Sequence, residues 1–193
     1  MTPDELQETV ARLRRQGTDD AFTEAKASAS DLPSDVWESV SAFGNTRGGT
    51  IILGLEESNG FKPVHRFAIE RVRDQFVSGF EGGKKREKLG NGPQYSMERM
   101  DFEGAQVLVI EVAEVESRFK PCYIQARGVA NGSFKRVDDK DLKLSATEIY
   151  ELQHVLEVSP ADRQVVEEAA KSDLDAWARP VLKLVYLVGL AGS

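Results

Sequence analysis

The sequence has little cysteine and little histidine. Cys122 is the single cysteine among 193 residues, so the chain cannot form an internal disulfide framework or a zinc site built from several cysteines. The two histidines, His65 and His154, have no partner at the spacing of metal ligands. We therefore exclude disulfide-rich domains and zinc modules. The residues around Cys122 resemble a strand, so we expect a buried, unreactive thiol.

Long hydrophobic runs are also absent. The most apolar stretch, residues 181–190, is interrupted by Lys183, Tyr186 and Gly189 and is too short to cross a bilayer. The first residues are polar and acidic, which is not typical of a signal peptide. We therefore expect a cytoplasmic protein without a membrane partner. The apolar stretch is expected to pack on the domain or on a second subunit, so a homodimer is one of two open arrangements.

Positive charge is in deficit. The chain has 25 Lys and Arg against 32 Asp and Glu, a formal net charge of −7 at pH 7, which argues against a protein that coats nucleic acid by charge alone. Residues 118–143 nevertheless carry seven basic and three acidic side chains, and residues 84–88 carry four basic and one acidic. Such stretches form either a local anion-binding face or ordinary solvated surface, and charge alone does not separate the two.

The sequence does contain a sharp change of pattern near position 45. Val36 and Val40 have helical spacing, which predicts a helix with one buried face. Residues 50–55 are β-branched and aliphatic, which predicts a buried strand. Between them, Gly48 and Gly49 permit a sharp turn and close backbone approach. We expect a helix–corner–strand unit around which the chain is organised.

The remaining patterns predict an α+β fold. Apolar periodicity indicates helices over about 3–16, 69–80 and 146–156, strands over 19–28, 94–101, 105–115, 121–125 and 133–137, and a turn over 127–132. Residues 82–93 have several breakers and no apolar period, which predicts a mobile loop. We expect a mixed β-sheet flanked by helices in a domain over residues 1–152, followed by a C-terminal helical extension over residues 153–193.

Several motifs occur in an order that resembles a known family. They are Glu24-Ala25-Lys26, the stretch from Ala42 to Gly54, Lys120 to Ile124, Arg127-Gly128, Gly132 to Val137, and Ser145 to Ile149. Over residues 19–152 this order is similar to the Schlafen AlbA-like domain, which occurs in bacterial transcriptional regulators and in animal Schlafen proteins. The resemblance implies the α+β fold described above and a nucleic-acid-binding module that serves regulation or defence.

The first functional hypothesis is binding without catalysis, at an anion pocket formed by the corner. The N–H groups of Gly48 and Gly49 can meet a phosphate oxygen of DNA or RNA, Arg47 lies beside them, and the resemblance implies that Lys26 faces the same corner. The candidate nucleic-acid-binding residues are Lys26, Asn45, Thr46, Arg47, Gly48, Gly49, Lys84, Lys85, Arg86, Arg118, Lys120, Arg127, Lys135 and Arg136. The alternative is that Asn45 caps the helix and Gly49 only permits the turn.

The second hypothesis, implied by the same resemblance, is metal-dependent endoribonuclease activity. Animal Schlafen ribonucleases use three carboxylates, two of them five positions apart and the third just after the central strand. Asp19, Glu24 and Glu56 occupy these positions and would hold Mg²⁺ or Mn²⁺. The first and third residue types differ from the family pattern, and Asp20 and Glu57 offer alternative registers. No other cofactor is expected.

A third hypothesis, ATP binding, is disfavoured. The corner has no Gly-Lys-Thr or Gly-Lys-Ser motif, and its helix precedes the turn, whereas the helix of a phosphate-binding loop follows it. Binding and ribonuclease activity are the two functions left open.

Overall fold

The structure, a computed structural model, describes residues 1–81 and 88–154. The predicted helices beyond residue 154 and most of the predicted loop, including Lys84, Lys85 and Arg86, lie outside the described residues. Within the described ranges, no helix is long and apolar enough to cross a membrane.

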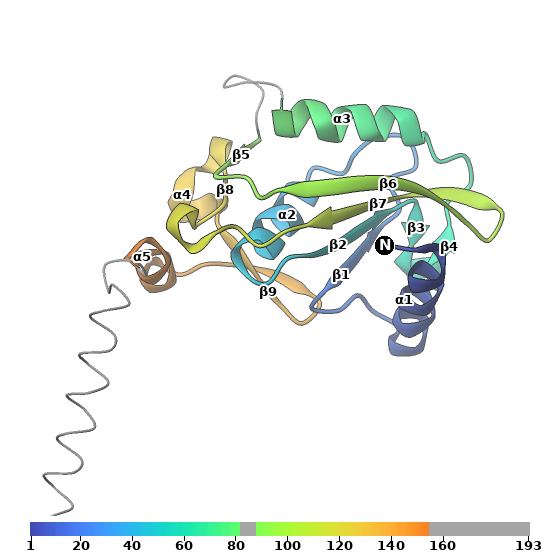
Figure 1. Cartoon of the computed structure of the whole chain (residues 1–193), viewed down its shortest axis with the longest axis horizontal. Helices are drawn as coiled ribbons and strands as arrows, with labels where there is room; N and C mark the ends of the chain where they lie inside the picture. The colour runs from blue at the N-terminus through green and yellow to red at the C-terminus, as the bar shows by residue number, and fades with distance from the viewer. Residues whose placement is uncertain (82–87, 155–193) are drawn as a thin grey trace, which may run out of the picture. The chain divides into compact units, whose positions relative to one another are not determined.

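A four-stranded mixed sheet forms the centre of the fold, in the order β1 (Thr23–Lys26), β2 (Gly49–Leu53), β7 (Ala105–Val112) and β6 (Tyr95–Phe102). β1 runs parallel to β2, and the other neighbours are antiparallel. β2 and β7 lie inside the sheet (Figure 1), which explains why their sequences are mostly apolar without strict alternation.

Helices cover both faces of this sheet (Figure 1). α2 (Val36–Asn45) and α3 (Ile69–Glu81) pack on one face, and α1 (Pro3–Gln16) packs on the other. The expected α+β fold, with a mixed sheet flanked by helices, is confirmed.

The other described elements are short. They are β3 (Leu55–Glu56), η1 (Glu57–Asn59), β4 (Lys62–Pro63), β5 (Leu89–Gly90), η2 (Ser117–Phe119), β8 (Tyr123–Ile124), η3 (Gln125–Arg127), α4 (Gly128–Gly132), β9 (Phe134–Val137), β10 (Lys140–Lys143) and α5 (Ala146–His154). α4 occupies the stretch where a turn is predicted. β9 and β10 form an antiparallel hairpin that packs beside α2.

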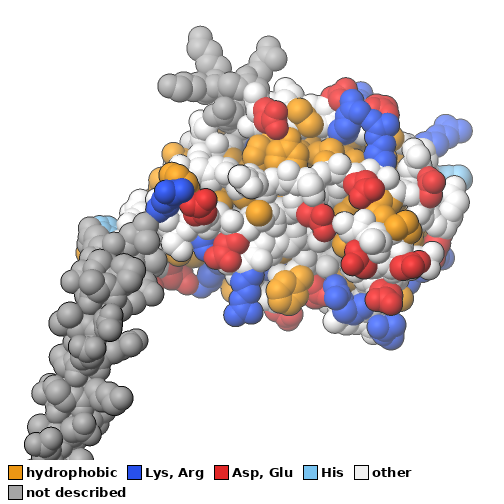
Figure 2. Space-filling view, viewed as in Figure 1, with side chains coloured by type: hydrophobic (Ala, Val, Ile, Leu, Met, Phe, Trp, Pro, Cys, Tyr) orange, Lys and Arg blue, Asp and Glu red, His pale blue; other side chains and the backbone are white. Residues whose placement is uncertain are grey.

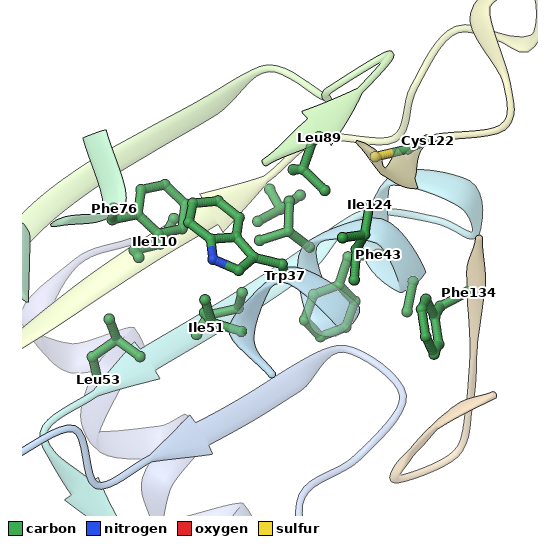
Figure 3. Close-up of a cluster of buried hydrophobic side chains, with 14 of the residues drawn as sticks. Trp37, Phe43, Ile51, Leu53, Phe76, Leu89, Ile110, Cys122, Ile124 and Phe134 are labelled. Atoms are coloured by element: carbon green, nitrogen blue, oxygen red, sulfur yellow. The ribbon is translucent and has the colours of Figure 1, made fainter. Parts of the chain in front are cut away.

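Side-chain alternation along β2 divides the core into two clusters. Ile51 and Leu53 pack with α2 and α3, where Trp37 stacks on Phe76 with ring centroids 5.2 Å apart (Figure 3). Ile52 points to the opposite face and packs with the buried stripe of α1. Hydrophobic side chains between α3 and the sheet are also visible from outside (Figure 2). Since both faces of the sheet are covered, its polar groups reach solvent mainly at edges and strand ends.

The bounds of α1 follow from local signals. The Thr2 hydroxyl accepts a hydrogen bond from the N–H of Glu5 (3.2 Å), and the Glu5 carboxylate accepts one from the N–H of Thr2 (2.6 Å). Gly17 ends the helix in the left-handed region, with φ 81°. The helix between them buries Leu6 and Val10 against the sheet.

The strand expected over residues 19–28 is shorter in the structure, because Asp19 and Asp20 turn the chain before β1. The Asp19 carboxylate accepts a hydrogen bond from the N–H of Ala25 (3.0 Å), and the Asp20 carboxylate accepts one from the N–H of Phe22 (2.9 Å). Such local side-chain bonds compete with the ladder of a sheet, so β1 begins only at Thr23.

Gly49→Ala tests the close packing at the start of β2. A Cβ atom at Gly49 would lie 2.4 Å from the ring of the buried Phe43, so the substitution is expected to lower the free energy of unfolding by about 1–3 kcal/mol. Urea denaturation followed by circular dichroism measures this change. In a Phe43→Leu background the same substitution should cost less, because the smaller side chain leaves room. An equal cost in both backgrounds would show that contact with Phe43 is not what requires glycine.

Candidate functional site at the glycine corner

The glycine corner, residues Asn45 to Gly49, joins the end of α2 to the start of β2. Gly48 has φ 72°, and its N–H donates to the carbonyl of Phe43 (2.9 Å), which closes the last turn of α2. A Cβ atom at Gly48 would lie 2.7 Å from the carbonyl oxygen of Val112, so a side chain has no room there. The N–H of Gly48 is used within the corner and, contrary to expectation, is not free for a phosphate oxygen.

Asn45 is buried and connects α2 to two distant segments. Its Nδ2 donates to the carbonyls of Cys122 (2.8 Å) and Phe134 (2.9 Å), and its Oδ1 accepts from the N–H of Cys122 (2.7 Å). Ser41, one turn earlier, donates to the same Cys122 carbonyl (2.9 Å) and accepts from the N–H of Phe134 (3.1 Å). The amide of Asn45 is therefore engaged inside the fold, and it forms neither the predicted phosphate contact nor a helix cap.

Cys122 is fully buried beneath the corner. Burial raises the pKa of its thiol to about 12, although a hydrogen bond with Ser41 acts in the opposite direction. The expectation of a buried thiol is confirmed, and a raised pKa agrees with the expected low reactivity.

Thr46 and Lys120 hold the backbone of the corner in place. The Thr46 hydroxyl donates to the carbonyl of Ala42 (2.8 Å) and accepts from the N–H of Arg136 (3.0 Å). The Lys120 ammonium donates to the carbonyl of Asn45 (3.0 Å) at the C-terminal end of α2, where a positive charge is favoured. Both residues are predicted nucleic-acid contacts, and in the structure both support the corner instead.

Arg136 is buried, with only 1% of its side chain exposed. Its guanidinium group contacts the carboxylates of Glu24 (2.7 Å) and Asp141 (2.9 Å) and donates to the carbonyl of Asp20 (2.9 Å). It also lies 5.2 Å from the centroid of the Phe43 ring. Arg136 connects β9 to β1 and α2, so the predicted contact with a nucleic-acid backbone is out of its reach.

Asp141 is a member of this network that sequence reasoning missed. It lies on β10 directly opposite Arg136 in the antiparallel register, so the two side chains share a face. Burial raises the pKa of Asp141, in spite of the hydrogen bond from Arg136 (2.9 Å) that lowers it. The sequence analysis predicts a strand over 133–137 but no second strand after it. A hairpin over residues 133–143 would have placed Asp141 opposite Arg136.

Glu24 and Lys26 lie on one face of β1, as strand alternation predicts. The Lys26 ammonium is 2.8 Å from the carboxylate of Glu24 and 2.9 Å from that of Asp35, and only 12% of the Lys26 side chain is exposed. Lys26 pairs with Leu53 at the last residue of β2, whereas Arg47 precedes the first residue of β2. Lys26 and Arg47 therefore lie at opposite ends of the β1–β2 pair, and the expected shared anion-binding face is not formed.

Most of the other predicted basic residues are also ion-paired. These pairs are Arg127–Glu38 (2.7 Å), Arg118–Glu116 (2.8 Å) and Lys135–Glu148. Arg47 differs from them, because its side chain is exposed and has no ion pair or hydrogen bond with a residue of the described ranges. Of the basic residues predicted to bind and described by the structure, Arg47 is the one with a free charge at the corner.

The three predicted metal ligands do not form a metal site in this arrangement. One carboxylate oxygen of Glu24 is held by Lys26 and the other by Arg136. Asp19 accepts a hydrogen bond from the N–H of Ala25 in β1, and Glu56 accepts one from the hydroxyl of Ser58. Across residues 1–81 and 88–154, no group of three or more Asp, Glu, His or Cys side chains could hold a metal ion. The residues thus do not fit the Mg²⁺ or Mn²⁺ that the resemblance implies.

Asp19 has a raised pKa. Burial is the main cause, and the negative charge of Glu24 adds to it, while the hydrogen bond from the N–H of Ala25 acts against it. The charge of Glu57 raises the pKa further. Glu57, and not the predicted Glu56, is therefore the residue after the central strand whose charge acts on Asp19.

A shallow hollow of about 350 Å³ lies at the corner. Its lining consists of Phe22, Arg47, Gly48, Gly49, Thr50 and residues 111–114. Two carboxylates on its rim are paired, Glu111 with the amino group of Met1 (3.3 Å) and Glu114 with Lys120 (2.5 Å). The lining of the hollow therefore includes the unpaired Arg47 and the exposed Phe22. Phe22 is a residue of this surface that sequence reasoning did not select.

Comparison with protein families matches residues 19–145 to the family described as Schlafen, AlbA_2. Among solved structures, the N-terminal domain of a Nitrosomonas europaea protein, described as related to the ATP-dependent DNA helicase RecG, is similar with a TM-score of 0.52 and 26% identity, over 71% of this chain and 91% of that domain. The DIP2311 protein of Corynebacterium diphtheriae has a TM-score of 0.47 and 17% identity, over 78% of this chain and 28% of that one. No curated protein matches the chain.

Asp19→Asn tests the cost of the buried carboxylate. The pKa of Asp19 is higher in the folded state than in the unfolded chain. As the pH rises from about 4, Asp19 therefore loses its proton first in the unfolded chain. The stability of the wild type falls over this range, until the pH passes the folded-state pKa. Asparagine cannot ionise, and its Oδ1 can still accept the hydrogen bond from Ala25. The variant should therefore melt at least about 2–4 °C above the wild type at pH 7.5, with a smaller difference at pH 4.5.

Asp20→Asn is the matched control for this measurement, since its carboxylate is paired with Arg12 (3.0 Å). It should show no gain that grows with pH. A constant difference between Asp19→Asn and wild type across the pH range would contradict the assigned ionisation.

Proposed function

Because this chain belongs to the Schlafen AlbA_2 family, we propose that it is a nucleic-acid-binding module and that the glycine corner is its contact surface. The family suggests a function related to nucleic acid. The Nitrosomonas europaea domain, part of a protein described as related to a DNA helicase, supports the same direction. We place this binding in transcriptional regulation or defence and in the cytoplasm.

The observation that carries the proposal is the unpaired Arg47 beside Gly48 and Gly49. Gly48 and Gly49 line the hollow beside Arg47, although the N–H of Gly48 already donates to the carbonyl of Phe43. The guanidinium of Arg47 supplies several N–H donors in a planar arrangement that suits phosphate oxygens. Thr50 lines the same hollow. The corner thus places a free cation in an open hollow.

The charge distribution supports a small contact with few phosphates. The formal net charge is −7, and acidic and basic side chains are interspersed over the face shown in Figure 2. Each phosphate contact adds roughly one unit to the salt dependence of binding, so a protein of this kind should show a shallow slope. Binding at the corner therefore depends more on where the free Arg47 lies than on the net charge of the whole chain.

Two other hypotheses are less well supported by the site. For ribonuclease activity, the oxygens of Glu24 are already held by Lys26 and Arg136. For ATP binding, α2 precedes the corner and β2 follows it, which is the reverse of a phosphate-binding loop. A homodimer stays a prediction.

A binding and cleavage assay tests the proposal. The protein is incubated with tRNA and with duplex DNA, in Mn²⁺ or in chelator, and both retention and cleavage are measured. We expect retention of nucleic acid without cleavage in both conditions. Cleavage that requires Mn²⁺ would instead support the ribonuclease hypothesis.

Arg47→Ala should weaken this binding several-fold and lower its salt slope by about one unit, because one phosphate contact is lost. Arg71→Ala is the matched control, since Arg71 is an exposed arginine on α3 with 64% of its side chain accessible. If Arg47→Ala and Arg71→Ala bind as tightly as the wild type, the corner is not the contact surface.

A further inference from the structure

Two phenylalanine rings are exposed close to the glycine corner. Phe22 and Phe119 are each 51% exposed, although the domain buries most of its other aromatic rings. An exposed ring forgoes the stabilisation that burial would give. Two such rings at one site indicate a surface that contacts another molecule.

Hydrogen bonds hold the backbone near each of the two phenylalanines to the corner or to the end of α2. The carbonyl of Phe22 accepts a hydrogen bond from the N–H of Thr50 (2.8 Å), and both residues line the same hollow. Phe119 lies between two anchors to the end of α2, since the N–H of Val115 donates to the carbonyl of Gly44 (2.8 Å) and Lys120 donates to the carbonyl of Asn45. These anchors fix the backbone at the two rings.

The order of strands places the start of β1 and the end of β7 on either side of the corner. Phe22 immediately precedes β1, and Phe119 follows β7, while the corner leads into β2 between them. The order of the three strands can be followed in Figure 1. Neighbouring strands are about 4.8 Å apart, so the ends of β1 and β7 are separated by roughly 10 Å. Phe22 lines the hollow, and Phe119 lies on the segment after β7 that is bonded to the end of α2.

Each ring is accompanied by an arginine. The guanidinium of Arg118 lies 4.7 Å from the centroid of the Phe119 ring, and Arg47 lines the hollow together with Phe22. Proteins that bind single strands combine aromatic rings, on which bases stack, with cations that meet the backbone. In a duplex the faces of the bases are covered by their neighbours, so exposed rings have little to stack on. The surface therefore suits unpaired bases.

We infer that the glycine corner binds single-stranded nucleic acid, by stacking unpaired bases on Phe22 and Phe119 while Arg47 contacts the backbone. This inference rests on the proposed function, because it names the ligand class of the same surface. Since stacking depends little on salt and few free cations are present, the binding of a single strand should resist salt more than the binding of a duplex.

Three ligands of equal length separate stacking from charge. Fluorescence anisotropy is measured with a labelled oligouridine, a duplex, and an abasic oligonucleotide that has phosphates but no bases. The full chain should bind the oligouridine at least about tenfold more tightly than either of the others. Phe22→Ala and Phe119→Ala should each weaken oligouridine binding by about 5- to 150-fold, the range for one lost stacked base, and leave abasic binding unchanged.

Two further variants serve as controls. Phe22→Trp keeps a ring and should retain the affinity of the wild type or exceed it. Val77→Ala removes an exposed apolar side chain from α3, 36% exposed, and should change nothing. Circular dichroism confirms that each variant is folded, since the loss of an exposed ring should not unfold the domain.

The outcomes distinguish the two proposals. If the abasic strand or the duplex binds as tightly as oligouridine, stacking is wrong while nucleic-acid binding stands. If Phe22→Ala and Phe119→Ala bind oligouridine like the wild type, the stacking surface is also wrong. If none of the three ligands binds, the proposed function fails together with this inference.

Discussion

The fold depends on a buried ion-pair network centred on the guanidinium group of Arg136. Through Glu24 this group joins the β9–β10 hairpin to β1, through Asp141 it ties β9 to β10, and it also lies against Phe43 of α2. Each of these charges has lost most of its contact with water, so it is stable only beside its partners, and removing one partner of such a pair typically costs about 3–5 kcal/mol. The backbone N–H of the same arginine is bonded to Thr46. A network remote from solvent thereby positions the surface of the corner.

The parts of the fold that the sequence predicts correctly depend on residues close together in the chain. The helix–corner–strand unit follows from the periodicity of α2, the aliphatic run of β2 and the adjacent Gly48 and Gly49. Glu24 and Lys26 share a face because alternate residues of any strand do so. The strands β6 and β7 lie where the sequence predicts strands over 94–101 and 105–115, and the short connection between them makes a hairpin. Each signal acts over a few residues, so one sequence is enough to read it.

The site could be predicted only in part, because its contacts join residues far apart in the chain. Asn45 bonds to Cys122, 77 residues later, and no local pattern indicates that its amide is used there. A count of basic side chains does not show which of them have acidic partners, so Arg136 is predicted at the surface although it is buried. Phe22 and Phe119 are the reverse case. Aromatic side chains are usually buried, but the tertiary packing leaves these two exposed.

The corner separates residues that hold the backbone from residues that face solvent, and this separation affects how the surface can evolve. Asn45 and Thr46 are fixed by hydrogen bonds inside the fold, so substitutions there change stability before they change anything else. The side chains of Arg47, Phe22 and Phe119 supply no hydrogen bond that the described fold requires, and exchanges at such positions usually alter stability little. Natural selection can therefore replace the ligand-facing set while the scaffold is retained, and relatives with the same backbone need not share a ligand.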